Sequence, residues 1–156
     1  MEDTTNHGNK HHSSIMVDRP FKHSTTVQMR FNDIDMLGHL NNSVYFSLFD
    51  LGKVEYFNTV RGNKNHWAKI DIVIANVNCD FIAPVYFTEP IAVKTQVASM
   101  HDKSFKMLQA VVNEKTGELK CLCSSVMVGF DAVKGVSAPL SQEWKDAISR
   151  FEGIEL

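Results

Sequence analysis

One long apolar segment, residues 41–60, stands between a short strand-like stretch and a region of almost continuous strand patterns, and this order constrains the fold most. Its apolar side chains cover more than one narrow helical stripe: Val44, Tyr45, Leu48, Phe49, Leu51, Val54 and Phe57. Asn41 or Asn42 can cap the first turn, and Arg61 with Gly62 favours termination of the last turn. A helix that is apolar on most sides needs covering, so we expect a central helix wrapped by other structure.

Alternating apolar and polar residues predict the strands that accompany this helix. The predicted strands are residues 22–31, 69–81, 91–100, 105–113 and 119–131. In the second of these, simple alternation places Ile70, Ile72 and Ile74 on one face. Val73, Val77, Cys79 and Phe81 are expected on or near the other. A single long helix against an antiparallel sheet is an α+β arrangement.

Three parts of the chain differ in composition. Residues 1–21 are mostly polar and lack periodicity, so a flexible tail is expected, with its histidines solvated rather than bound to metal. Residues 22–137 contain the long helix and the strands. Residues 138–156 contain a short helix that Ser141 can cap, followed by a tail.

Composition excludes several classes of protein. The net charge of -2 over 156 residues gives no basis for nucleic-acid binding. No apolar run has membrane-spanning length, so no membrane insertion is expected, and the polar N-terminus lacks a signal-peptide core. Cys121 and Cys123 face the same side of a strand, which fits small buried thiols in a reducing compartment. We expect a soluble cytoplasmic protein.

A polar cluster lies directly before the long helix. It reads D-x-D-x-x-x-H-x-N-N-x-x-Y, with Asp33, Asp35, His39, Asn41, Asn42 and Tyr45 at the fixed positions. Polar groups beside a core-forming segment are costly to desolvate, so such a cluster indicates either chemistry or a tight turn. The pattern resembles the hotdog-fold thioesterases of the 4-hydroxybenzoyl-CoA thioesterase type, and also the repeat motif of acyl-ACP thioesterases. The resemblance implies a hotdog fold, in which a curved antiparallel sheet wraps the long central helix.

The same resemblance implies an acyl-CoA thioesterase that needs no metal or organic cofactor. Asp35 aligns with the catalytic acid of these enzymes, either as a nucleophile on the thioester carbonyl or as a general base for water. The alternative role for Asp35 is a side-chain cap of the loop, for which Asp33 is the better candidate.

Other positions of the motif have expected roles in binding. Backbone N–H groups of Gly38, His39 and Leu40 are candidate oxyanion donors near the helix N-terminus. The His39 side chain could orient Asp35 or water, donate to the substrate carbonyl, or lock the loop through backbone carbonyls. Asn41 and Asn42 are expected to cap the helix and to hold the loop by hydrogen bonds rather than to act in catalysis. Both are also expected to lie beside the substrate.

The chain departs from the acyl-ACP thioesterase motif at Leu37, where that family carries asparagine. This departure favours an aspartate-centred site and acyl-CoA as the substrate, with acyl-ACP as the alternative. A related branch uses an acid on the helix, for which Asp50 or Glu55 would be the candidates. A salt bridge to a basic residue of another strand or subunit is the alternative role for an acid on this helix.

Side chains outside the motif offer weaker signals. Tyr45, Phe46, Phe49 and Phe57 could line an acyl pocket, although aromatic residues on a central helix are usually core. Lysines on the strands (Lys94, Lys103, Lys106 and Lys120) could contact CoA phosphates, although solvated strand faces are the expected setting.

The resemblance also implies a homodimer or homotetramer, because hotdog sheets pair edge to edge and form their sites at subunit interfaces. A non-catalytic acyl-thioester-binding protein of the same fold is the alternative function. Asp35 favours the enzyme, because a pure binder has no need for an acid beside a carbonyl.

Overall fold

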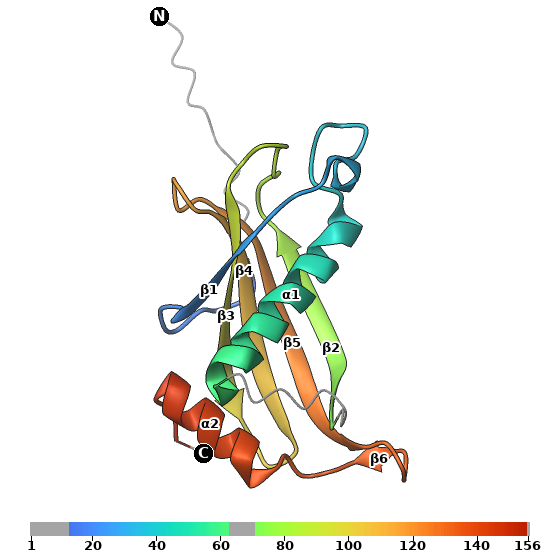
Figure 1. Ribbon diagram of the computed structural model, residues 1–156, viewed down its shortest axis with the longest axis vertical. Coiled ribbons are helices and arrows are strands. Elements are labelled where there is room, and N and C mark those ends of the chain that lie inside the picture. Colours follow the sequence, from blue (N-terminus) through green and yellow to red (C-terminus); the bar gives the residue numbers. More distant parts are fainter. Residues whose placement is uncertain (1–12, 63–70, 156) are drawn as a thin grey trace, which may run out of the picture.

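The structure is a computed structural model that describes residues 13–62 and 71–155. The elements are β1 (His23–Val27), the 3-10 turn η1 (Phe31–Asp33), α1 (Asn42–Arg61), β2 (Ile72–Phe81), β3 (Ile91–Met100), β4 (Ser104–Asn113), β5 (Leu119–Asp131), β6 (Val136–Ser137) and α2 (Gln142–Glu152). Figure 1 shows α1 lying across one face of the sheet, with α2 at the end where α1 terminates. The predicted α+β architecture, a long central helix against an antiparallel sheet, is confirmed.

The main strands form one antiparallel sheet in the order β1-β3-β4-β5-β2, and β6 pairs with the end of β5. The predicted strands agree with the observed ones, apart from the first, which ends at Val27 because the chain turns into η1 soon afterwards. The start predicted for the second strand lies outside the described residues. Neither η1 nor β6 was predicted.

A bulge in β2 reverses the predicted facing of its side chains. The register shifts between Ile74 and Asn76, so that the pairs Ile74–Met127 and Val77–Ser125 lie on the same face of the sheet. Cys79 and Phe81 continue on that face. The prediction of two separate faces is therefore wrong for these residues, because one extra residue shifts the alternation by one position. These apolar side chains all face the side that carries α1.

The contact between α1 and the sheet is closest at Gly52. A Cβ atom added there would lie 2.5 Å from Val93 Cγ1 and 3.0 Å from Gln109 Nε2. Gln109 also donates through Nε2 to the backbone oxygen of Phe49 at 2.9 Å and to Thr95 Oγ1 at 3.1 Å. A buried amide thus links the helix backbone to β3 and β4, at a place where only glycine fits without displacement.

The sheet covers one side of α1. Tyr45, Phe49 and Tyr56 are at most 2% exposed and pack toward the sheet, whereas Phe46 and Leu51 are 46% and 53% exposed. Within the described chain, the other structure expected to wrap this helix therefore covers one side of it. Two flanks of α1 carry apolar side chains that the described residues leave accessible.

Both ends of the described chain contribute to the folded domain. Ile15 packs on the sheet face opposite α1, and Arg19 donates to the backbone oxygen of Val97 at 2.6 Å. At the other end, the buried carboxylate of Glu152 accepts the Tyr56 hydroxyl at 2.7 Å and the Val97 N–H at 2.9 Å. Ile15 and Arg19, from the segment expected to be a tail, thus contact the folded domain. Within the described residues, no helix is long and apolar enough to cross a membrane.

Replacing Gly52 with alanine tests the close contact. On an exposed helix this change stabilises by about 1 kcal/mol, because alanine has the better helix propensity. Here the new Cβ meets Val93, so we expect the free energy of unfolding to fall by about 1–3 kcal/mol in urea denaturation. Gly52→Ala combined with Val93→Ala should lose less than the sum of the single changes, because the second change makes room for the methyl group. Additive losses would argue against the contact.

Candidate functional site

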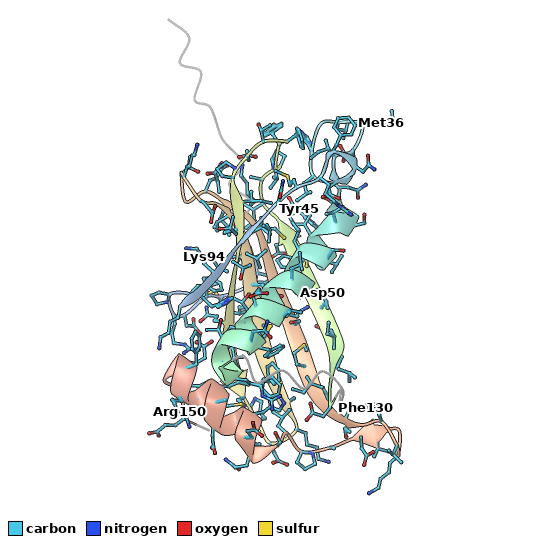
Figure 2. The ribbon with its side chains drawn as sticks, in the orientation of Figure 1. Met36, Tyr45, Asp50, Lys94, Phe130 and Arg150 are labelled. Carbon is cyan, nitrogen blue, oxygen red and sulfur yellow. The ribbon has the colours of Figure 1, made fainter. Side chains whose placement is uncertain are left out.

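The segment between β1 and α1 is held by backbone pairing. Ile34 and Leu40 form an antiparallel bridge, and the Asn41 N–H donates to the Asp33 backbone oxygen at 2.8 Å. The Leu40 N–H donates to the Val85 oxygen at 2.7 Å, which attaches this segment to the connection between β2 and β3. These bonds form a compact loop, here called the motif loop (residues 30–41). Met36, labelled in Figure 2, lies at its tip.

Asp33 has the structural role predicted for it. Its carboxylate is buried and accepts the Arg30 N–H at 2.8 Å and Arg30 Nη2 at 2.9 Å. These bonds to the Arg30 side chain and backbone lower the pKa of Asp33 below its usual value, so it stays ionised and holds the start of the loop.

Asp35 combines a turn with an accessible oxygen. Its Oδ1 accepts the N–H groups of Leu37 at 2.9 Å and His39 at 3.2 Å. Its backbone oxygen accepts the N–H of Gly38, whose φ of +79° is the left-handed conformation that closes this turn. Asp35 thus also has the loop-capping role that was the alternative interpretation. Its Oδ2 accepts no hydrogen bond from the described residues, so one oxygen fixes the side chain and the other stays available.

The predicted backbone oxyanion donors are already engaged. The N–H groups of Gly38, His39 and Leu40 donate to the Asp35 oxygen, to Asp35 Oδ1 and to the Val85 oxygen, respectively. A donor set at these three positions would therefore require the loop to open. At the start of α1, the N–H of Asn42 has no acceptor among the described residues. The Asn42 N–H, at the first residue of the helix, is thus the backbone donor that a substrate oxygen can use without opening the loop.

The remaining polar side chains of the motif differ in their hydrogen bonding. Asn41 is the N-cap of α1, and its Oδ1 accepts the Ser43 N–H at 3.0 Å, as predicted. The side chain of Asn42 has no hydrogen-bond partner among the described residues. The His39 ring packs edge-on against Tyr86, with 5.0 Å between centroids, and makes no hydrogen bond within the described chain. His39 therefore locks the loop through its backbone, and its ring nitrogens remain available.

These groups meet at a cleft of about 490 Å³. Its lining comprises Asp35, Leu37, His39, Leu40, Asn41, Asn42, Tyr45, Phe81, Ile82, Ala83 and Pro84. The polar residues come from the motif loop and the start of α1, while the apolar wall comes from the end of β2 and the residues after it. Six of the seven predicted site residues line this cleft, and Gly38 shapes the turn behind it. The arrangement suits a ligand with one polar reacting end and one apolar end.

Tyr45 forms the junction between the two parts of the cleft. Its ring packs edge-on against Phe81, with 5.1 Å between centroids. Burial raises the pKa of the Tyr45 hydroxyl above its usual value, so this group stays protonated and can donate. Phe49 and Phe57 belong to the core and Phe46 is half-exposed, so Tyr45 is the one predicted pocket aromatic of α1 that lines the cleft.

Lys120 anchors the apolar wall, a role that the sequence did not indicate. Its side chain is 4% exposed, and its ammonium lies 2.9 Å from Glu89 Oε1, 2.9 Å from Glu118 Oε2 and 3.1 Å from the Pro84 oxygen. Glu89 also accepts the Tyr86 N–H at 2.6 Å. The expectation that Lys120 lies on a solvated strand face is therefore wrong. Its charge holds the connection between β2 and β3, which in turn carries the motif loop.

The candidate acids on α1, unlike Asp35, lie outside the cleft. Asp50 forms a salt bridge with Lys53 of the same helix at 3.1 Å, and its side chain is 67% exposed. A salt bridge was expected, but the prediction of a partner on another strand or subunit is wrong for Asp50, because Lys53 one helical turn away reaches it first. Glu55 is exposed, and neither acid lines the cleft.

A double-mutant cycle tests the anchor. Lys120→Met leaves the carboxylate of Glu89 without its main partner, so we expect a loss of about 3 kcal/mol in the free energy of unfolding. Glu89→Gln should lower the free energy of unfolding less in the Lys120→Met background than in the wild type. We expect urea denaturation to give a coupling energy of about 1–3 kcal/mol. The exposed pair Lys134–Asp131 is the matched control and should show much weaker coupling. Equal coupling in the two pairs would contradict the anchoring role.

Comparisons with known proteins agree with this geometry. The model of the thioesterase-like superfamily matches residues 29–148. A thioesterase from Thermus thermophilus, solved in complex with coenzyme A and zinc, is 27% identical, with a TM-score of 0.77 over 87% of this chain and 98% of that one. The uncharacterized protein YsmA of Bacillus subtilis is 25% identical over 85% of this chain and 93% of its own.

A 1,4-dihydroxy-2-naphthoyl-CoA thioesterase from Synechocystis is 17% identical, with a TM-score of 0.70 over 80% of this chain and 93% of that one, which shows the shared fold alone. The predicted hotdog fold is thereby confirmed. The matched region includes the motif loop, α1 and all five strands from β2 to β6, and the chain belongs to the thioesterase-like superfamily.

Proposed function

We propose that the protein is an acyl-CoA thioesterase, which hydrolyses an acyl thioester to the free acid and CoA. One observation carries this proposal: a single cleft is lined by Asp35, whose Oδ2 accepts no hydrogen bond from the described residues, and by Asn42, whose N–H is unpaired among them. Ester and thioester hydrolysis requires a nucleophile or base together with a donor for the oxyanion. The Thermus thermophilus relative, whose solved complex contains coenzyme A, supports CoA as the thiol half of the substrate.

Each residue of the cleft has a separate role in the proposed hydrolysis. Asp35 Oδ2 either attacks the carbonyl carbon, which releases the CoA thiolate and gives a mixed anhydride that water then hydrolyses, or removes a proton from a water that attacks the carbonyl and displaces the thiolate. The Asn42 N–H donates to the oxygen that becomes negative, with assistance from the positive end of the α1 dipole. His39 donates to the substrate or orients the water, and the wall at Tyr45 and Phe81 contacts the acyl group.

A change from Asp35 to asparagine separates catalysis from loop structure. Asparagine keeps an acceptor for the Leu37 and His39 N–H groups but cannot act as a base or nucleophile. We expect acyl-CoA hydrolysis, followed as thiol release over a panel of aliphatic and aromatic esters, to fall by at least about a hundredfold. Asp50→Asn is the matched control and should keep nearly full activity.

The outcomes of this experiment discriminate between the alternatives. If Asp50→Asn loses hydrolytic activity and Asp35→Asn does not, the catalytic acid lies on α1. Binding of a CoA ester without thiol release from any member of the panel would favour the non-catalytic protein. Release from acyl-ACP alone would favour the carrier-protein substrate.

A change from Asn42 to proline tests the oxyanion donor. Proline has no N–H and is tolerated at the first helical position, and Asn41 has φ -62° and ψ 134°, the extended conformation that a following proline requires. The helix should therefore persist while the donor is lost. We expect kcat of this variant to fall by about 10²–10³-fold. The kcat of Asn42→Ala, which keeps the N–H, should fall far less. Equal losses in the two variants would assign the effect to the side chain.

A homodimer completes the proposal. β2 is a ten-residue edge strand, and Ile74, Val77 and Phe81 on it are 45%, 37% and 42% exposed. Pairing of two β2 edges would cover these residues and satisfy the backbone groups of the edge. Sedimentation velocity should give a dimer or a dimer of dimers at micromolar concentration, and Val77→Glu should shift it toward monomer. A monomeric wild type would contradict this assembly.

A further inference from the structure

Three thiols gather where β2 meets β5, outside the cleft lining and without a role in the proposed hydrolysis. Antiparallel pairing places Cys79 directly opposite Cys123, while Cys121 lies two residues along β5, opposite Phe81. All three face α1. Cys121 and Cys123 are buried in the core that contains Tyr45 and Phe49, and Cys79 packs against it. All three are free thiols.

The three thiols are not equivalent. Cys121 and Cys123 are 0% and 2% exposed, whereas Cys79 lies on the edge strand and is half-buried. The neighbouring Cys121 and Cys123 thiols, and the charge of Lys53, lower the pKa of Cys79 well below its usual value. The neighbouring Cys79 sulfur together with burial raises the pKa of the other two. A thiolate is the nucleophilic form of cysteine, so Cys79 is the reactive member.

The positively charged neighbour is part of the fold. Lys53 lies on α1, and its side chain is 11% exposed although its partner Asp50 is mostly solvated. A largely buried ammonium stabilises an anion nearby more strongly than a surface lysine does, because water screens it less. Cys79 thus has a partly open position, a cation and two neighbouring thiols, which together favour an activated cysteine.

Backbone register decides which thiol can bond to Cys79. Residues directly opposite in an antiparallel pair have Cβ atoms about 4.5–5.5 Å apart, while diagonal neighbours are about 7–8 Å apart. A disulfide needs a Cβ separation of about 3.5–4.5 Å. A small shift brings Cys79 and Cys123 within this range, and β2 can make it because it is an edge strand with a bulge. The diagonal partner Cys121 would need a much larger movement of the backbone.

We propose that Cys79 is a site of oxidation by hydrogen peroxide or an organic hydroperoxide, with Cys123 as its resolving thiol. The Cys79 thiolate attacks one peroxide oxygen, the O–O bond breaks, and hydroxide or alkoxide leaves, which gives a sulfenic acid. The Cys123 sulfur then attacks Cys79 Sγ and loses its proton, the S–O bond breaks, and water leaves as the S–S bond forms. Two thiols lose two electrons in total, and the peroxide is reduced to water, or the hydroperoxide to an alcohol and water. This chemistry does not depend on the proposed hydrolysis.

The test uses the reduced full-length protein with a small molar excess of hydrogen peroxide. Non-reducing digestion and mass spectrometry should find a peptide linkage from Cys79 to the β5 segment in folded wild type. Because Cys121 and Cys123 follow Lys120 and share one tryptic peptide, variants assign the bond. Cys121→Ala should form the linkage as wild type does. Cys123→Ala should instead retain a sulfenic acid at Cys79, trapped by dimedone, and Cys79→Ser should form neither product.

Folding provides the second control. In urea the thiols lose their fixed register and the charge of Lys53, so the linkage should form at least about tenfold more slowly than in the folded protein. Circular dichroism of each variant verifies that its fold is intact. The proposal is overturned if folded wild type forms no intramolecular linkage, if Cys121→Ala abolishes it, or if it forms equally fast in urea.

Discussion

The contact at Gly52 fixes the position of α1, and the site depends on that position. Because Val93 and Gln109 fill the space where a side chain would be, the helix backbone approaches the sheet closely at Gly52, between the buried side chains of Phe49 and Tyr56. The Gln109 amide then holds the Phe49 oxygen at 2.9 Å, which fixes the helix in rotation as well as in distance. The helix N-terminus is thereby placed beside the end of β2, and the cleft lies between them.

Around this helix the site is built mainly from backbone geometry. Asp33 and Asp35 both accept loop N–H groups, but Asp33 uses both of its oxygens within the loop, whereas Asp35 uses one. That difference assigns structure to one carboxylate and leaves the other available for chemistry. The loop is in turn bonded to Val85, in the connection that Lys120 holds through the Pro84 oxygen. A buried cation on β5 therefore supports the position of a carboxylate far away in the sequence.

The outer strand β2 has three functions in a short length. Phe81 forms the cleft wall against Tyr45, Cys79 lies in the thiol cluster, and the free edge is suited to a second subunit. The bulge after Ile74 makes this possible, since it brings the apolar residues on both sides of it to the face that carries α1. A change at this edge would therefore affect the cleft, the thiols and the proposed subunit contact together.

The sequence by itself determined the features that depend on neighbouring residues. The strands, the long helix, the Asn41 cap and the role of Asp33 all follow from periodicity and short-range hydrogen bonding, and six of the seven predicted site residues line one cleft. Tertiary structure alone decided the rest. The bulge in β2, the burial of Lys120, and the bond from Leu40 to Val85 that removes a predicted oxyanion donor all depend on partners distant in sequence. A local pattern reports which groups a segment offers, whereas only the folded chain determines which of those groups are already bonded.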